Sequence, residues 1–292
     1  MSVTLHEIES QPAVWSRAAE LAGEVRTQLP PAGQRIAVIG CGTSFYIAQA
    51  AAAARESAGA GESDAFVASE MPTGRDYDSV LAISRSGTTT EVVRALMALP
   101  AHVPSLALSA VPDTPVVRSA RDAVLMPFAD EESVVQTRFA TAAVALLRAH
   151  IGDDLAPAIA DAERSLAQPL PADPADFEHF VFLGTGWTVG LASEGALKFR
   201  EAAGAWTEAY PAMEYRHGPI SVAGPGSLVW LLGPAPDGLI ADIENTGATV
   251  LEGTLDPMAE LVQIQRAAVS LAQTRGLDPD QPRHLTRSVV LP

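Results

Sequence analysis

Three titratable residues share one face of a predicted helix. Glu194, Lys198 and Glu201 follow one another at spacings of four and three residues in an alanine-containing segment. Residues at these spacings lie on the same side of a helix, so two carboxylates would flank one ammonium group. A carboxylate beside a cation and partly shielded from water can move a proton next to a carbonyl group. Ordinary surface ion pairs have the same spacing, and the pattern alone leaves both interpretations open.

A second candidate group is the hydroxyl-rich segment Ser84–Thr90, which also contains Arg85 and Gly87. It follows the apolar run Val80–Ile83, typical of a buried strand, and precedes apolar residues at helical spacing. The first turn of a helix presents unpaired N–H groups and a partial positive charge, which together bind phosphate. A helix cap needs only one hydroxyl, so a cluster of hydroxyls with a cation favours an anion site over a simple cap.

His217 and Cys41 are further candidates. His217 precedes Gly218-Pro219 in the polar segment Glu208–Pro219, which we predict to be a loop. It is a candidate acid–base group, with a solvated loop histidine as the alternative. The remaining histidines show no ligand spacing, so no metal site is expected. Cys41, the one cysteine, follows a buried strand in a tight turn, where a structural thiol is expected rather than a nucleophile.

Alternating strands and helices must position these groups. Short apolar runs predict strands at 36–39, 65–67, 80–83, 105–108 and 122–127, the last a candidate edge strand. Helices are predicted at 5–29, 43–58 and 136–150. This order is typical of an α/β fold with a doubly wound, mainly parallel sheet.

The second half of the chain repeats the first. Gly184 and Gly186 correspond to Gly40 and Gly42, and each pair follows an apolar run and precedes a helix. We therefore predict two tandem α/β domains, at residues 1–152 (with a helical lead-in at 1–33) and 153–292. The third glycine of a dinucleotide-binding motif is missing from both turns and no P-loop is present, so NAD and ATP are not indicated.

Composition narrows the class of partner. The chain has 292 residues, of which 48% are hydrophobic, and a formal net charge of -16. This charge disfavours nucleic acid and an anionic membrane surface as partners, and a phosphate site would depend on local donors. No apolar run reaches the ~20 residues of a transmembrane helix. The N-terminal segment lacks a signal-peptide profile, so we expect a cytoplasmic protein.

In combination, these motifs resemble the double SIS (sugar isomerase) domain family. They are most similar to the isomerase half of glucosamine-6-phosphate synthase and to amino-sugar-phosphate deaminases and deglycases. The segments that carry the resemblance occur in the family's order, at 40–44, 68–70, 84–89, 191–201, 216–219 and 280–289. The resemblance implies two tandem SIS domains, a sugar phosphate ligand, no cofactor and a homodimer.

The resemblance also implies a role for each matching residue. Glu201 matches the base that moves a proton between C1 and C2, and His217 the ring-opening histidine supplied across the dimer interface. Lys198 and Glu194 match neighbouring active-site residues. The remaining matches concern binding of the sugar and its 6-phosphate, in loops and a C-terminal tail that contain Cys41, Gly42, Thr43, Ser44, Ser84, Arg85, Ser86, Thr89, Val134, Gln136 and Arg287.

Three positions depart from the synthase. Arg85 stands where the synthase has glutamine, and Arg287 where it has lysine, so any role of Arg287 there is binding. Ser2 follows Met1 in place of the cysteine of a glutaminase domain. Neither glutamine-dependent synthesis nor a transcription regulator is expected.

The expected function is aldose–ketose isomerisation of an amino sugar 6-phosphate with deamination or deglycation. The alternatives are a plain sugar-phosphate isomerase and a non-catalytic sugar-phosphate sensor.

Overall fold

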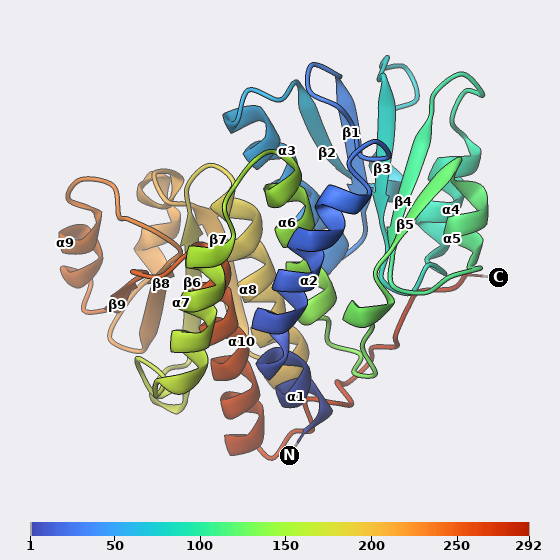
Figure 1. The fold of residues 1–292 in the computed structure, drawn as a ribbon. Coiled ribbons are helices and arrows are strands. Elements are labelled where there is room, and N and C mark those ends of the chain that lie inside the picture. Colours follow the sequence, from blue (N-terminus) through green and yellow to red (C-terminus); the bar gives the residue numbers. More distant parts are fainter. Residues whose placement is uncertain (1, 292) are drawn as a thin grey trace. The chain divides into compact units, whose positions relative to one another are not determined.

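The computed structural model describes residues 2–291, which form two compact units (Figure 1). The five-stranded unit comprises Ala13–Glu132, Gln136–Leu155 and Thr286–Pro292, and the four-stranded unit comprises Met1–Pro12, Ser133–Val135 and Ala156–Leu285. Each unit thus takes a terminal segment from the opposite end of the chain, an exchange that the predicted domains at 1–152 and 153–292 do not include.

The five-stranded unit is a parallel sheet in the order β2-β1-β3-β4-β5. The strands are β1 (Ile36–Gly40), β2 (Ser63–Val67), β3 (Ser79–Ile83), β4 (Ser105–Ser109) and β5 (Asp122–Leu125). The helices are α2 (Gln11–Glu24), α3 (Thr43–Ser57), α4 (Thr90–Met97), α5 (Pro115–Ser119) and α6 (Arg138–His150). Figure 1 shows α3 and α6 on one side of the sheet and α4 and α5 on the other. The parallel sheet flanked by helices is therefore confirmed.

The central strands are apolar on both faces because helices cover both. Ala37 and Ile39 of β1 join a core cluster with Val92 and Leu96 of α4. The alternate residues of β1 are also buried and point to the opposite face. This double burial explains why the central strands β1 and β3 are apolar runs in the sequence.

The four-stranded unit is a parallel sheet in the order β7-β6-β8-β9. The strands are β6 (His179–Gly184), β7 (Trp206–Pro211), β8 (Ser227–Leu231) and β9 (Thr249–Glu252). The helices are α1 (Val3–Glu9), α7 (Ala156–Ala167), α8 (Thr188–Ala203), α9 (Leu239–Glu244) and α10 (Pro257–Thr274). Phe180 and Phe182 of β6 pack on Phe199 of α8, with ring centroids 4.6 and 5.3 Å apart. None of the helices within residues 2–291 is long and apolar enough to cross a membrane.

Two elements differ from the predictions. The loop predicted at 208–219 begins with edge strand β7, in which Glu208 and Tyr210 alternate with smaller residues, a pattern that an edge strand with half-buried side chains accommodates. The single helix predicted at 5–29 is two helices. The first helix ends before Ser10, whose hydroxyl donates to the Glu7 carbonyl oxygen (2.7 Å). Pro12 lies in the first turn of the second helix, α2.

A tight turn of the same kind connects β1 to α3 and β6 to α8. A Cβ atom at Gly40 would lie 2.5 Å from the Ser44 carbonyl carbon, and one at Gly184 would lie 2.4 Å from the Thr188 carbonyl oxygen. Only glycine allows the first turn of the following helix to pass so close. The backbone correspondence predicted between the two turns is therefore present.

Candidate active site

The hydroxyl-rich loop lies where the five-stranded sheet changes its winding direction. β1 and β3 are paired neighbours, and the chain continues from β1 to one edge and from β3 to the other. In sheets of this kind, ligands bind at the carboxyl ends of the two strands at such a switch point. Thr43 and Ser44 follow β1, and Ser84–Thr89 follow β3, so these predicted phosphate-site residues gather at one edge.

Hydrogen bonds inside the loop prepare two serines to donate to an anion. The Gly87 N–H donates to Ser84 Oγ (3.2 Å), and the Thr88 N–H donates to Ser86 Oγ (3.3 Å). A hydroxyl that accepts in this way can still donate its own proton to a phosphate oxygen. Gly87 has a φ of 65°, and a Cβ there would lie 2.0 Å from Thr114 Oγ1, so this turn requires glycine.

The Gly40–Ser44 corner contributes buried hydroxyls and a thiol. Thr43 and Ser44 are buried in the first turn of α3. Burial, together with the Glu91 carboxylate, raises the pKa of the Cys41 thiol to about 11. A thiol with this pKa is protonated at neutral pH, which agrees with a structural rather than a nucleophilic Cys41.

Arg85 is buried, although the sequence suggested a cation available to a ligand. Its side chain is 1% exposed, and Nη1 lies 3.5 Å from Oε2 of Glu131, which is 0% exposed. Its Nη2 donates to the carbonyl oxygen of Arg287 (3.1 Å). The charge of Arg85 is therefore balanced inside the protein, and this geometry argues against a direct phosphate contact.

Residues 286–291, which we call the strap, lie along the hydroxyl-rich loop. Thr88 Oγ1 and Ser288 Oγ are 2.8 Å apart. The Thr90 N–H donates to the Val289 carbonyl oxygen (3.2 Å), and the Leu291 N–H donates to Thr90 Oγ1 (2.9 Å). These bonds hold the strap at the beginning of α4.

Arg287 anchors the strap through its side chain. Its Nη2 lies 2.5 Å from Asp130 Oδ1, and its Nη1 donates to the Glu131 carbonyl oxygen. A role of Arg287 in sugar binding stays a prediction. Of the other two predicted binding residues, Val134 belongs to the four-stranded unit and Gln136 to the five-stranded unit, and both are half-buried.

The predicted acid–lysine group is assembled on α8. Lys198 Nζ lies 3.2 Å from Glu194 Oε1 and 2.5 Å from Glu201 Oε2. The side chains of Lys198 and Glu194 are 1% and 0% exposed, whereas that of Glu201 is 19% exposed. This group is not a surface ladder, because only its outermost carboxylate reaches solvent.

The two carboxylates also fix the charge of Lys198. Burial alone would lower the pKa of its ammonium group, but Glu194 and Glu201 outweigh burial, and the pKa of Lys198 is raised. Lys198 therefore stays protonated at neutral pH. In that form it can orient and stabilise Glu201, but it cannot act as a base or as an amine nucleophile.

His217 is exposed at the end of the short 3-10 helix η4 (Glu214–His217). Gly218 follows with a φ of 133°, and a second 3-10 helix, η5 (Pro219–Val222), begins there. Two side chains anchor this segment. Tyr215 is fully buried, and Arg216 Nε lies 2.7 Å from Asp242 Oδ2. An exposed histidine on an anchored turn is accessible to a ligand or to a second copy of the chain.

Within the four-stranded unit, His217 lies near the carboxyl ends of the strands and Glu201 near their amino ends. His217 follows the carboxyl end of β7, whereas Glu201 lies near the end of α8, just before β7 begins. The helix rises about 20 Å between Thr188 and Glu201, at about 1.5 Å per residue. One copy of this unit therefore does not bring the two side chains together.

Sequence reasoning missed Glu131. This carboxylate is the buried partner of Arg85 and also accepts from Thr137 and Arg138. A signal existed in the acidic run Asp130–Glu132, because a buried arginine needs a carboxylate. Nothing in the spacing indicates which acidic residue pairs with Arg85.

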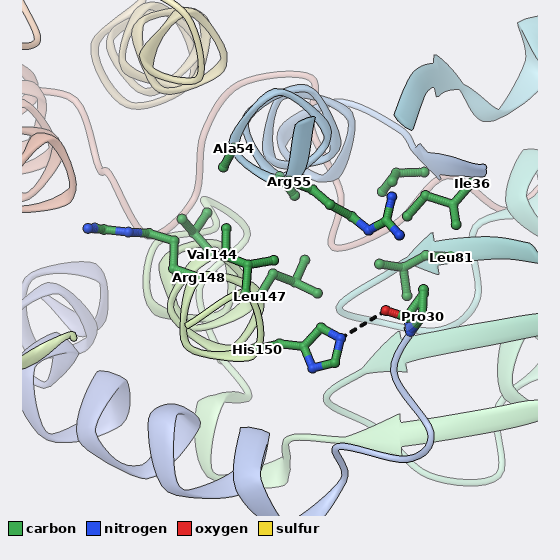
Figure 2. A pocket seen from close by; sticks show the side chains of 12 residues that line it. Pro30, Ile36, Ala54, Arg55, Leu81, Val144, Leu147, Arg148 and His150 are labelled. Atoms are coloured by element: carbon green, nitrogen blue, oxygen red, sulfur yellow. Dashed lines mark hydrogen bonds between the residues drawn. The ribbon is translucent and has the colours of Figure 1, made fainter. Parts of the chain in front are cut away.

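Two cavities of the five-stranded unit lie apart from the hydroxyls at 84–89. One cavity has a volume of about 20 Å³ and is lined mostly by apolar side chains of β1, α3 and α6 (Figure 2). At this cavity, His150 Nε2 lies 2.9 Å from the Pro30 carbonyl oxygen. This volume holds about one water molecule and is too small for a sugar. A larger groove of about 970 Å³ is lined by α4 and residues 68–80, among others, but not by the hydroxyls at 84–89.

No cluster of three His, Cys, Asp or Glu side chains suited to a metal ion occurs within residues 2–291.

Part of the sequence matches a known family model. Residues 29–151 match the family model of the SIS domain. This range contains the whole five-stranded sheet and the hydroxyl-rich loop. The matched range ends at residue 151, and a second SIS domain at 153–292 stays a prediction.

Relatives resemble a longer stretch. The chain is 26% identical, over 88% of its length, to the glutamine–fructose-6-phosphate aminotransferase (isomerizing) of Methanothermobacter thermautotrophicus, and covers 52% of that protein. A segment of 45% of the chain is 34% identical to the protein of the same name from Nostoc sp., covering 26% of it. The chain thus spans about half the length, or less, of the curated relatives it matches.

Solved structures share the fold over nearly the whole chain. Glucosamine-6-phosphate deaminase from Thermotoga maritima superposes with a TM-score of 0.86 at 25% identity, covering 99% of this chain and 100% of that one. Tagatose-6-phosphate ketose/aldose isomerase from Escherichia coli superposes with a TM-score of 0.81 at 18% identity, covering 100% and 97%. The latter likeness shows the shared fold alone.

Proposed function

We propose that this protein is an enzyme that isomerises an amino sugar 6-phosphate between its aldose and ketose forms and releases ammonia or an amine. The SIS domain at residues 29–151 and the similarity to an isomerizing aminotransferase and a glucosamine-6-phosphate deaminase support the substrate class. The reaction itself needs a base, a phosphate handle and no cofactor.

The observation that carries the proposal is the environment of Glu201. Its carboxylate is 19% exposed and lies 2.5 Å from a buried ammonium group. It is thus the one member of the Glu194–Lys198–Glu201 group that is both positioned and accessible. A carboxylate in this situation can take a proton from the carbon next to a carbonyl group and return it to the neighbouring carbon.

The chemistry balances without a cofactor. Glu201 removes the C2 proton of the open-chain aldose, the electrons form a C1–C2 double bond, and the carbonyl oxygen at C1 is protonated. Return of the proton to C1 then gives a carbonyl group at C2, or an imine when C2 carries nitrogen. Addition of water to the imine releases ammonia and leaves the ketose.

The hydroxyl-rich loop would hold the phosphate. Ser84 and Ser86 already accept backbone N–H groups, and their own protons would go to phosphate oxygens. The Arg85 charge is not needed for this role, because Glu131 balances it.

A plain ketose–aldose phosphate isomerase is the second candidate. The Glu201 geometry would serve both reactions equally, and tagatose-6-phosphate ketose/aldose isomerase shares the fold. The two candidates differ only in whether nitrogen leaves the substrate.

The test is proton NMR of the purified protein in D2O with a panel of 6-phosphosugars, including glucosamine 6-phosphate, and an ammonia assay on the same samples. Deuterium at C1 or C2 together with ammonia supports the amino sugar reaction, and deuterium without ammonia supports the plain isomerase. Binding without exchange would identify a sugar-phosphate sensor and refute the enzymatic proposal.

A matched pair of variants tests the base. Glu201→Gln keeps the shape and an acceptor for Lys198 but removes the basic carboxylate, and should slow exchange by about 10²- to 10⁴-fold. Glu163→Gln removes an exposed carboxylate of α7 in the same unit and should leave exchange unchanged. Full exchange by Glu201→Gln would refute the assigned base.

His217 enters the proposal through a second copy of the chain. Because one unit places His217 and Glu201 near opposite ends of the strands, a histidine that opens the sugar ring beside Glu201 would come from a partner in a homodimer. Mixing His217→Ala and Glu201→Gln chains should restore activity in heterodimers, in which one site has both groups. No recovery would refute this sharing.

A further inference from the structure

One buried cation joins three separate segments of the five-stranded unit. Arg85 belongs to the hydroxyl-rich loop, Glu131 precedes α6, and Arg287 belongs to the strap. The guanidinium of Arg85 faces Glu131 Oε2 through Nη1 (3.5 Å) and donates to the Arg287 carbonyl oxygen through Nη2 (3.1 Å). A single side chain thus touches both segments that lie beside the loop.

Glu131 is itself fixed from its other oxygen. Oε1 accepts from the Thr137 N–H (2.5 Å), the Thr137 hydroxyl (2.8 Å) and the Arg138 N–H (2.8 Å). The carboxylate therefore holds the beginning of α6 with one oxygen while the other faces Arg85. Arg85 is consequently held in one place by a partner that cannot easily move.

The strap is bonded to the loop as well as to this pair. Ser288 and Val289 contact Thr88 and Thr90 of the loop, while the Arg287 side chain binds Asp130 and the Glu131 carbonyl oxygen. Thr88 in turn donates through its N–H to Ser86 Oγ (3.3 Å), one of the proposed phosphate donors. A docked strap therefore restrains the loop around that donor.

We propose that Arg85 is a positioning residue that couples phosphate binding at the hydroxyl-rich loop to docking of the strap. This inference rests on the proposed function, which assigns the loop to phosphate. Ordering the loop before the ligand arrives lowers the entropy cost of binding, so the strap-docked state binds phosphate more tightly. By reciprocity, bound phosphate favours the docked strap by the same factor.

Arg85→Gln, the change to the synthase residue, tests the coupling. Hydrogen–deuterium exchange would be followed at the Thr90 and Leu291 amides, and affinity measured by calorimetry with inorganic phosphate and with fructose 6-phosphate. In the wild type, either probe should slow exchange in the strap. In Arg85→Gln, strap exchange should be about tenfold faster and phosphate binding about tenfold weaker. Arg94→Gln, an exposed arginine of α4 outside the network, should change neither.

A double-mutant cycle separates positioning from direct contact. Deleting the chain after Leu285 should weaken phosphate binding as much as Arg85→Gln does, and combining both changes should add nothing. If Arg85→Gln weakens binding equally in the chain without the strap, Arg85 contacts phosphate directly and the inference is overturned. Arg85→Gln/Glu131→Gln removes both buried charges and gives the same readout should the single variant fail to fold.

The outcomes also separate this inference from the proposed function. Faster strap exchange in Arg85→Gln with unchanged phosphate affinity overturns the coupling and leaves the proposed function intact. Wild-type protein whose 84–90 amides are not protected by fructose 6-phosphate overturns the phosphate assignment, and the coupling with it. Arg85→Lys, which keeps the charge facing Glu131, should recover part of the strap protection.

Discussion

Replacing Lys198 by methionine should destabilise the four-stranded unit far more than replacing either carboxylate by glutamine. Methionine is close to lysine in length and fills the site, but Glu194, which is 0% exposed, would lose the cation 3.2 Å from its Oε1. An uncompensated buried charge costs about 3–5 kcal/mol. We expect Lys198→Met to lower the free energy of unfolding by this amount.

Two further variants show whether the loss of stability comes from the unpaired charge of Glu194. In Glu201→Gln, Lys198 keeps Glu194 as a charged partner and gains an amide oxygen that can still accept, so the expected loss is about 1 kcal/mol. In Lys198→Met/Glu194→Gln the cation and the fully buried anion are both removed. Most of the stability should return, as it does when both members of a buried pair are replaced.

The assay is urea unfolding at pH 7 followed by tryptophan fluorescence, which reports chiefly on the four-stranded unit, since Trp187, Trp206 and Trp230 belong to it. With a slope of about 2 kcal/mol/M, the midpoint of Lys198→Met should fall by roughly 2 M. A Lys198→Met midpoint within 0.5 M of wild type, a limit of roughly 1 kcal/mol at this slope, would refute the reasoning. So would a double variant that is less stable than the single one.

Three further predictions follow from the geometry. Ser84→Ala and Ser86→Ala should each weaken fructose 6-phosphate binding about tenfold, measured by calorimetry, because each removes a hydroxyl donor; unchanged affinity in both would contradict the phosphate assignment. Alkylation of Cys41 by iodoacetamide at pH 7.5 should be roughly a hundredfold slower than that of a thiol at the ordinary pKa of 9.0, because its pKa is about 11, and Cys41→Ser should retain turnover. Asp280 accepts from the Thr4 hydroxyl and from the Thr4 and Val3 N–H groups at the start of α1. Burial acts to raise the pKa of Asp280, but these hydrogen bonds outweigh burial and lower it. The stabilisation by ionised Asp280 is therefore present above the pKa of the unfolded state and lost as pH falls through the pKa of the folded state. Asp280→Asn should lower the free energy of unfolding by about 1 kcal/mol at pH 7, and in thermal unfolding its difference in stability from the wild type should shrink below pH 4. A stability difference independent of pH would exclude the charge of Asp280 as its origin.

Local patterns predicted most of the fold. The central strands are apolar on both faces, so runs such as 36–39 and 80–83 stand out in the sequence. β7 was missed because its position at a sheet edge permits the polar residues Glu208 and Tyr210, which indicate a loop when read without their neighbours.

The candidate site divides in the same way. Glu194, Lys198 and Glu201 could be grouped from spacing, because helix geometry alone brings them within bonding distance. The partners of Arg85 could not, because Glu131 and Arg287 reach it through tertiary packing. The sequence shows an arginine in a loop but not whether a carboxylate elsewhere neutralises it.

The strap also has a consequence for synthesis on the ribosome. Thr88 and Ser288 are separated by 200 residues, so the loop is translated long before the segment that holds it. At about 5–20 residues per second, the delay is about 10–40 s. During this time the five-stranded sheet can form around Arg85 and Glu131, but the beginning of α4 lacks its last partners. The nascent chain can therefore complete the edge that carries the hydroxyl-rich loop only after residue 288 has been translated.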